Sequence, residues 1–217
     1  MIIIGLTGYA GAGKDTMGEV MVEHYGFHRL AFADAVRDMA LALDPYLEIK
    51  GGPGPFGTIE LYRLSEYLEV CKGDWNEAKK HPEVRQTLQR LGTECVRNIL
   101  GDNQWIDVIE RKIVPISLNH GRDRFVITDV RFPNEDDRLH TWFDAKLVRI
   151  HREGHQANAD REHSSERYIN ILKADYEMTN NGTLEEFRAT VHAFMHAFMH
   201  EFLGIKPRRR ADSPGSH

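Results

Sequence analysis

The first residues of the chain restrict its fold more than any other part of the sequence. Residues 2–16 read IIIGLTGYAGAGKDT, in which a short isoleucine run is followed by the spacing G-x-x-x-x-G-K from Gly8 to Lys14. The isoleucine run predicts a buried strand. After Lys14, apolar residues recur at three- and four-residue steps until Gly26, the pattern of a helix that ends at a glycine. A strand, a glycine-rich loop and a helix in this order predict a phosphate-binding loop.

The residue types of this loop suit a polyphosphate. Gly8, Gly11 and Gly13 let the backbone adopt conformations that other residues avoid. Successive N–H groups, with that of Ala12 among them, can then converge on phosphate oxygens at the positive end of the helix. Lys14 is placed to lie beside the β- and γ-phosphates of ATP and to balance charge during transfer. The alternative is a glycine-rich turn with a surface lysine, which the flanking strand and helix disfavour.

The residues after Lys14 depart from the general motif, which puts a Mg²⁺-binding hydroxyl directly after the lysine. Here Asp15 follows the lysine and Thr16 comes next. We therefore expect Asp15 to hold Mg²⁺ through water and Thr16 to donate to an α-phosphate. A lysine, a variable residue and a threonine resemble the nucleoside-monophosphate kinase branch of these proteins, in which water and nucleotide oxygens hold most of the metal.

The composition favours one domain and disfavours several classes of protein. A chain of 217 residues is long enough for one sizeable core, and its net charge of -5 argues against a dedicated nucleic-acid or anionic-membrane binder. Cys71 and Cys95 have no metal-ligand spacing and are interpreted as reduced packing thiols. The N-terminal apolar run is too short to span a bilayer and lacks a basic leader, so we expect a cytoplasmic protein, in a bacterial host if a phage encodes it. A homodimer is left open.

The remaining pattern predicts an α/β fold, with a parallel sheet flanked by helices. Further strands are expected at residues 27–32, 125–127, 146–150 and 176–179, and helices after a cap at Asp34, at 134–143 and after the capping box of Thr183 and Glu186. We expect one domain over residues 1–205. Its core is 1–45 and 102–205, a helical insertion occupies 46–101 with a mobile loop at 51–58, a lid spans 151–166, and 206–217 form a disordered tail. Within the insertion, Leu61, Leu64 and Leu68 share one helix face, and a helical pattern that starts at Pro82 is interrupted at residues 92–94.

Two further features of the sequence bear on chemistry. Asp129 follows the apolar run at 125–127 and is expected at the carboxyl end of a strand, the edge at which open α/β sheets bind ligands. His192, His196 and His200 repeat at four-residue steps in the last helix, nearly opposite its phenylalanines. Because no acidic or cysteine ligand is near, this stripe is interpreted as a solvent face in preference to a Zn²⁺ site.

Together these motifs resemble the bacteriophage-type deoxynucleoside monophosphate kinases over nearly the whole chain to about residue 190. The resemblance rests on Gly13-Lys14-Asp15-Thr16, Phe32-Ala33-Asp34, Leu91-Gly92-Thr93-Glu94, Asp129-Val130-Arg131-Phe132-Pro133-Asn134-Glu135 and Asn180-Asn181-Gly182-Thr183-Leu184. The segment that begins at Asp129 is the most specific of these. The resemblance implies a P-loop kinase fold and transfer of the γ-phosphate of ATP to a deoxynucleoside monophosphate.

The resemblance also implies roles for individual residues. Asp129 would help Asp15 to order hydrated Mg²⁺. Arg131 would bind the acceptor phosphate through two hydrogen bonds, unless it forms a structural ion pair with Glu135 or Asp136. Arg37, one turn from Asp34, is a second candidate at the acceptor, with a solvated helix face as its alternative. The residues that close over the γ-phosphate would be Arg152 and Arg161, whose alternative is exposed loop charge, and those beside adenine would be Asn181 and Gly182.

Two other functions remain open at this point. A dephospho-coenzyme A kinase has a similar loop and lid, but its acceptor is a ribose hydroxyl, which benefits from a carboxylate base such as Asp34. A phosphate acceptor is already anionic and needs no base. A non-catalytic ATP-binding sensor is the third alternative. It would not need Lys14, Asp129 and several lid arginines around a transferring phosphoryl group.

Overall fold

The computed structural model describes residues 1–50, 59–121, 123–154 and 168–202. Its elements are β1 (Ile2–Thr7), α1 (Lys14–Tyr25), β2 (His28–Leu30), α2 (Phe32–Leu43), β3 (Tyr46–Lys50), β4 (Ile59–Arg63), α3 (Leu64–Val70), α4 (Trp75–Ala78), α5 (Pro82–Gln89), the π-helix η1 (Arg90–Leu100), α6 (Gln104–His120), β5 (Arg124–Ile127), α7 (Pro133–Phe143), β6 (Lys146–His151), β7 (Tyr176–Thr179) and α8 (Leu184–Phe202). None of the described helices is long and apolar enough to cross a lipid bilayer.

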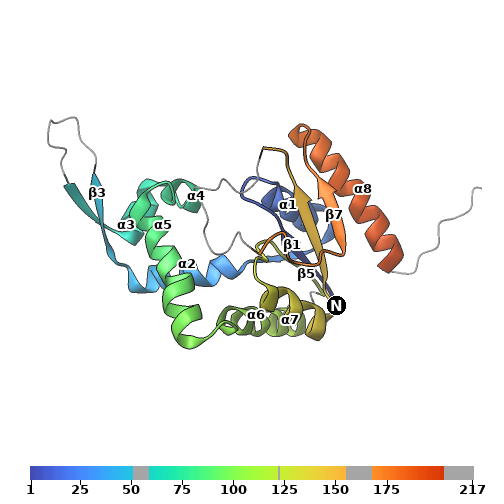
Figure 1. Ribbon diagram of the computed structural model, residues 1–217, viewed down its shortest axis with the longest axis horizontal. Coiled ribbons are helices and arrows are strands. Elements are labelled where there is room, and N and C mark those ends of the chain that lie inside the picture. The colour runs from blue at the N-terminus through green and yellow to red at the C-terminus, as the bar shows by residue number, and fades with distance from the viewer. Residues whose placement is uncertain (51–58, 122, 155–167, 203–217) are drawn as a thin grey trace, which may run out of the picture.

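Five strands form one parallel sheet in the order β2-β5-β1-β6-β7 (Figure 1). The central strand β1 is buried along its whole length, which explains its continuous apolar run. Ile4 of β1 lies opposite Val126 of β5 and Lys146 of β6. Because all strands run the same way, the loop after β1 and Asp129 after β5 reach the same edge of the sheet. The predicted α/β fold is confirmed.

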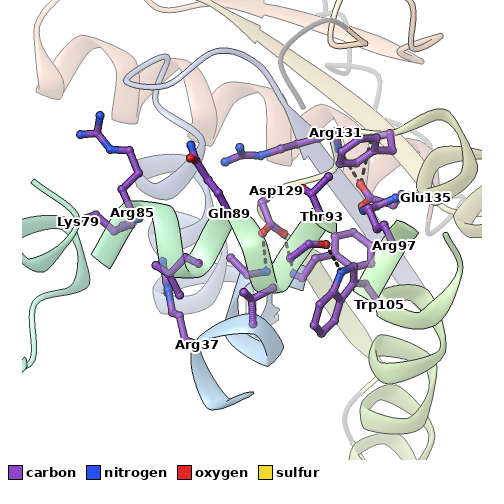
Figure 2. A pocket seen from close by; sticks show the side chains of 16 residues that line it. Arg37, Lys79, Arg85, Gln89, Thr93, Arg97, Trp105, Asp129, Arg131 and Glu135 are labelled. Atoms are coloured by element: carbon purple, nitrogen blue, oxygen red, sulfur yellow. Dashed lines mark hydrogen bonds and ion pairs between the residues drawn. The ribbon is translucent and has the colours of Figure 1, made fainter. Parts of the chain in front are cut away.

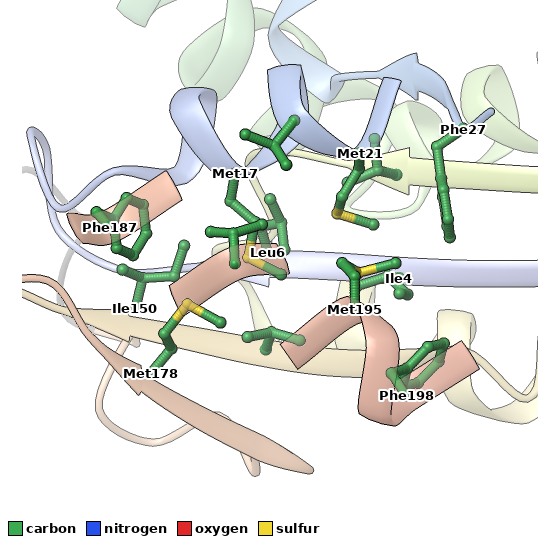
Figure 3. Close-up of a cluster of buried hydrophobic side chains, with 14 of the residues drawn as sticks. Ile4, Leu6, Met17, Met21, Phe27, Ile150, Met178, Phe187, Met195 and Phe198 are labelled. Carbon is green, nitrogen blue, oxygen red and sulfur yellow. The ribbon is translucent and has the colours of Figure 1, made fainter. Parts of the chain in front are cut away.

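Helices cover both faces of this sheet. Ile2, Ile4 and Leu6 of β1 point to one face, where they pack with α1 and α8. Figure 3 shows the methionines and phenylalanines of this layer, with Met17 and Met21 from α1 and Met195 and Phe198 from α8. On the other face, Ile3 packs with the buried residues of α2, α6 and α7. The alternation along β1 is the two-residue period of a strand between two layers.

The insertion contains an antiparallel hairpin that the sequence analysis missed. Strands β3 and β4 pair over their whole length, with Tyr46 opposite Arg63, and stand at the end of the molecule farthest from α8 (Figure 1). The prediction of a helical stretch through Leu61 was therefore wrong: Leu61 lies on β4 and is exposed. Leu47 of the hairpin and Leu64 of α3 are buried in a small separate core with Val84. This core holds the insertion together.

The insertion ends in the π-helix η1. The predicted interruption of the helix at Gly92 is absent from it. Helix α5 starts at Pro82, as predicted, and continues without a break into η1; the residue before it, His81, is the N-cap. Hydrogen bonds in a π-helix span five residues, so each turn is wider than an α-turn. Gly92 lies inside η1, and its carbonyl accepts a hydrogen bond from Trp105 Nε1 of α6 at 2.9 Å. A Cβ at Gly92 would face Val36 of α2 at 3.6 Å, an ordinary contact, so this hydrogen bond depends on the backbone of η1 and not on the missing side chain.

Helix α8 begins at the predicted capping box, in which Thr183 N donates to Glu186 and Glu186 N donates to the Thr183 hydroxyl. The interpretation of the histidine stripe as a solvent face needs correction. His192 is half-buried, because the Tyr25 hydroxyl of α1 lies 3.0 Å from its Nδ1 and the His24 ring packs against it. Among the described residues, no three histidine, cysteine or acidic side chains could hold a metal ion.

Several predictions fall outside the described residues. These are the loop at 51–58, most of the lid with Arg161, and the tail at 206–217. The division into core, insertion and lid stays a prediction. Of the two cysteines, Cys71 packs against the small core of the insertion, whereas Cys95 is exposed and is not a packing thiol.

Candidate active site

A cavity of about 240 Å³ lies over the glycine-rich loop. It is lined by Gly11, Gly13, Lys14, Asp15, Thr16, Arg152, Asn180, Gly182, Leu184 and Phe187. The loop, the residue after β6 and the turn before α8 therefore meet around one space. Gly182 lies at its wall, whereas Asn181 does not line it and accepts a hydrogen bond from Glu153 N at 3.0 Å. The contact of both residues with adenine stays a prediction.

The shape of the loop depends on two glycines with positive φ. Gly8 has φ of 145°, and a Cβ there would lie 2.4 Å from the Ile150 carbonyl of β6. Gly13 has φ of 114°, and a Cβ there would lie 2.6 Å from Asn180 Nδ2. The buried Asn180 donates from this same nitrogen to the Ala12 carbonyl at 2.8 Å. Asn180, the residue after β7, therefore supports the glycine-rich loop directly, and no side chain fits between the two.

Cations surround this cavity. Lys14 Nζ donates to the carbonyls of Gly8 and Tyr9, at 2.6 and 2.9 Å, so its ammonium lies within the ring of the loop. Arg152 reaches the Gly11 carbonyl at 3.5 Å. Helix α1 begins at Gly13 without a side-chain cap, which leaves its first N–H groups directed at the loop. A helix N-terminus with two cations is a site for a polyphosphate.

The residues present fit a hydrated Mg²⁺ that arrives with a nucleotide. Asp15 is exposed at the wall of the cavity, and Thr16 lines it. Asp129 has a structural task as well, because its two carboxylate oxygens accept the N–H groups of Phe32 and Ala33 at 2.8 Å each. Asp129 therefore caps α2 from a distant part of the chain. The predicted cap at Asp34 was wrong, since α2 begins at Phe32.

A second cavity, of about 300 Å³, opens between α2, the insertion and the loop after β5 (Figure 2). Its lining includes Asp129 and Arg131 from the sheet edge, Arg37 from α2, and Lys79 from the end of α4. Helices α5 and η1 contribute a polar stripe, consisting of Arg85, Gln89, Thr93 and Arg97. A four-residue step overshoots a turn of α-helix and falls short of a π-turn. The change of helix type therefore keeps the stripe directed at the cavity.

Five cationic side chains line this second cavity, namely Arg37, Lys79, Arg85, Arg97 and Arg131. Arg37 binds Asp34 at 3.0 Å and its side chain is half-buried, so it is not on a solvated helix face. Burial, with the positive charges of Arg37 and Arg131 nearby, lowers the pKa of Lys79, while Asp15 and Asp129 act in the opposite direction. Acidic side chains of both cavities therefore act on the pKa of Lys79. A concave site with clustered cations suits an anionic group such as a phosphate.

Behind Arg131 lies a buried ion pair between Arg97 and Glu135, both less than a tenth exposed. One oxygen of Glu135 contacts the Arg97 guanidinium, and the other accepts the backbone N–H groups of Arg131 and Phe132 at 2.8 and 3.1 Å. Burial raises the pKa of Glu135 to about 7, against the opposing effect of Arg97 and the two N–H groups. Glu135 was the alternative ion-pair partner predicted for the Arg131 side chain. In the structure its carboxylate binds Arg97 and two backbone N–H groups.

The structure brings most of the predicted site residues to these two cavities. Asp34 does not line the second cavity and contacts Arg29 and Arg37 instead. Sequence analysis missed Asn180, Lys79 and the polar stripe. The stripe had a signal, its four-residue spacing, but a solvated helix face has the same spacing. Asn180 is part of a quoted motif, yet nothing in the sequence indicates its bond to a loop that is 168 residues away.

Comparison with known proteins adds to this geometry. A protein of Acanthamoeba polyphaga mimivirus, provisionally named a deoxynucleotide monophosphate kinase, is 27% identical over 88% of this chain and 94% of its own. The deoxynucleoside-5′-monophosphate kinase of Escherichia phage T5 is 32% identical over 44% of this chain and 38% of its own, and the deoxynucleotide monophosphate kinase of Enterobacteria phage T4 is 24% identical over 57% and 47%. Each match to a phage protein thus spans less than half of that protein.

Among solved structures, a dephospho-CoA kinase from Campylobacter jejuni is similar with a TM-score of 0.45, at 16% identity over 92% of this chain and 98% of that one. A likeness at this level carries no information on function. The model of the deoxynucleotide monophosphate kinase family matches residues 58–191. Since this match covers more than half of the chain and includes the polar stripe, Arg131 and the turn before α8, the chain belongs to the deoxynucleotide monophosphate kinase family.

Proposed function

We propose that the protein transfers the γ-phosphate of ATP to the 5′-phosphate of a deoxynucleoside monophosphate, with Mg²⁺, giving the diphosphate. One observation carries the assignment of sites. The cavity of the glycine-rich loop and the cavity of Arg37, Lys79 and Arg131 open at the same edge of the sheet, because the loop follows β1 and Arg131 follows β5, the parallel neighbour of β1. A donor and an acceptor phosphate bound in them would approach each other at the carboxyl edge of the sheet.

The reaction needs no proton removed from the acceptor. A bond forms between the γ-phosphorus and an oxygen of the acceptor phosphate, and the bond from the γ-phosphorus to the β–γ bridging oxygen breaks, so that ADP leaves with the electron pair. Lys14 holds the phosphates of the donor and Arg152 neutralises charge on the transferred group. Arg131 and Arg37 hold the acceptor phosphate. Mg²⁺, held through water by Asp15 and Asp129, would neutralise charge on the donor phosphates.

A kinase that acts on a hydroxyl would use Asp34 as a base. The contacts of Asp34 favour the phosphate acceptor, because its two oxygens already accept from Arg29 at 2.8 Å and Arg37 at 3.0 Å. Both oxygens of Asp34 are therefore occupied, and neither is directed at an acceptor hydroxyl. The carboxylate serves here to orient Arg37.

A coupled assay of ADP release tests the proposal with the four deoxynucleoside monophosphates, AMP and dephospho-coenzyme A as acceptors. We expect turnover with at least one deoxynucleotide and none with dephospho-coenzyme A. Arg131→Lys should weaken use of the acceptor strongly while ATP binding survives, since lysine loses the planar fork. Asp34→Asn should keep measurable turnover. A larger rate loss at Asp34 than at Arg131, in variants that circular dichroism shows to be folded, would overturn the choice of acceptor.

A further inference from the structure

The carboxylate of Glu135 joins two parts of the molecule through its two oxygens. Oε2 accepts the backbone N–H groups of Arg131 and Phe132, at 2.8 and 3.1 Å, and so holds the segment that follows β5. Oε1 binds the guanidinium of Arg97, which belongs to η1, the last helix of the insertion. One buried side chain therefore connects the segment that carries Arg131 to the helix that carries the polar stripe.

Arg97 is held from three sides. Its guanidinium binds Glu135, lies 3.7 Å from the centre of the Phe132 ring, and reaches the Asp102 carbonyl at 3.4 Å. Asn134 of α7 donates to the same carbonyl at 2.9 Å. The corner between η1 and α6 is thus joined to the start of α7 twice, by Arg97 with Glu135 and by Asn134 with Asp102. Figure 2 shows the Arg97–Glu135 pair next to Arg131.

Stability alone does not account for this arrangement. Removing two charges from water is costly, and an apolar pair of the same volume is often equally stable or more stable. An apolar pair would not have the direction of an ion pair, whose partners fix both distance and angle. The position of the ion pair fits a geometric role. Arg131, whose backbone Glu135 holds, lines the same cavity as Arg97.

We propose that Arg97 and Glu135 are positioning residues for phosphoryl transfer, which hold Arg131 in register with the polar stripe of the insertion. Neither is a catalytic residue. When the insertion moves to enclose an acceptor, the pair carries the Arg131 backbone with it. The cation and the wall of the acceptor cavity then reach the transferred group together. This inference rests on the proposed function of the second cavity.

The first test compares Glu135→Gln with Glu110→Gln. The amide of the first variant has one acceptor oxygen in place of two, so it loses the ion pair and cannot hold Arg97 and the two backbone N–H groups together. Glu110 of α6 is a matched control. Its carboxylate binds Arg138, which lies on the same helix as Glu135, at 2.7 Å, and does not touch Arg131. We expect Glu135→Gln to lower kcat at least tenfold and to raise KM for the deoxynucleotide, with KM for ATP within twofold of the wild type. Glu110→Gln should stay within twofold throughout. Equal kinetics for the two variants would overturn the proposal.

A second test separates positioning from stability. Arg97→Met alone leaves Glu135 buried without its cation and should lower the Tm, whereas Arg97→Met combined with Glu135→Gln contains no buried charge and should recover most of that Tm. Its kcat should nevertheless remain at least tenfold below the wild type. Recovery of both Tm and kcat would mean a merely structural pair. If the double variant does not fold, the comparison of Glu135→Gln with Glu110→Gln decides.

A readout that is independent of turnover separates this inference from the proposed function. Hydrogen exchange of the Arg131 and Phe132 amides should become at least tenfold faster in Glu135→Gln and stay unchanged in Glu110→Gln. Unchanged exchange in both variants would refute the positioning role. A wild-type protein that phosphorylates no deoxynucleotide would instead refute the proposed function and leave the exchange result standing.

Discussion

The two glycines at the ends of α1 allow a quantitative test of how the phosphate-binding loop is fixed. Gly13 precedes the helix with φ of 114°, and Gly26 follows it with φ of 69°. A Cβ at Gly26 meets no atom within 4 Å, whereas a Cβ at Gly13 would lie 2.6 Å from Asn180 Nδ2 and 2.8 Å from Phe187 Cε1. The main difference between the two variants is therefore that Gly13→Ala requires Asn180 and Phe187 to move, whereas Gly26→Ala requires no neighbour to move.

The expected losses follow from these contacts. Alanine with φ near 69° costs about 1–2 kcal/mol in the left-handed region, and this is the whole effect at Gly26. At Gly13 the backbone strain of about 1–3 kcal/mol is joined by overpacking of about 1–3 kcal/mol. Displacing Asn180 also breaks its hydrogen bond to Ala12, which contributes about 1 kcal/mol. Gly13→Ala should therefore lose about 3–7 kcal/mol, a large part of a typical stability of about 5–15 kcal/mol.

Urea unfolding followed by circular dichroism measures both variants. The midpoint should fall much further for Gly13→Ala than for Gly26→Ala at an unchanged slope, because the extent of the fold is the same. Gly13→Ala should also weaken ATP binding, since the loop must shift to admit the methyl group. Equal loss of stability in the two variants would refute the idea that Asn180 and Phe187 fix the loop.

Three further predictions concern two residues of the site and one surface histidine. Lys14→Ala should lower kcat by about 10²–10³ in the coupled assay, in a protein that circular dichroism shows to be folded, and near-normal turnover would contradict the kinase assignment. Lys79→Met should raise KM for the deoxynucleotide by about 10–100-fold, the value of a charged hydrogen bond to phosphate, and leave KM for ATP unchanged; an equal effect on both would place Lys79 elsewhere. Burial lowers the pKa of His140, but its bonds to Asp175 and Asp136 outweigh this and raise the pKa above 6.5. The stability from this pairing is complete below pH 6.5 and is lost as the pH rises through the folded pKa, so His140→Gln should destabilise at about pH 6 and much less at about pH 9; a loss that does not change with pH would contradict the assignment.

The sequence predicts the core of this fold because its signals are local. Glycines of the loop, the isoleucines of β1 and the periodic methionines of α1 each identify their own element. The hairpin was missed because Leu61, Leu64 and Leu68 match a helical spacing by coincidence. In the structure Leu61 is on an exposed strand and Leu64 is buried in α3. The two-residue alternation of Leu47 and Ile49, which both pack in the small core, was the competing signal.

A site residue could be predicted from its own surroundings in the sequence only where its role depends on residues that are near it in the chain. Lys14 and Gly13 belong to that class. Asp129 as the cap of α2 and Asn180 as the support of the loop do not, because their partners are 97 and 168 residues away. Lys79 lies after the short helix α4 and has no distinguishing pattern. Its role follows from the convergence of α2, α4 and the sheet edge, which is a property of the packed molecule.

The π-helix has a consequence for the lengths that this segment can take in evolution. Substitutions in η1 that keep its polar face should be tolerated, but loss of one residue should not. Deleting one residue from a helix shifts the angular position of every residue beyond it by one residue step, which is about 100° in an α-helix and somewhat less in the wider π-helix. Such a deletion between Gly92 and Arg97 would turn the guanidinium away from Glu135, while Arg85 and Gln89 kept their positions. Natural variants of this enzyme should therefore vary in composition along η1 and gain or lose residues in the hairpin instead.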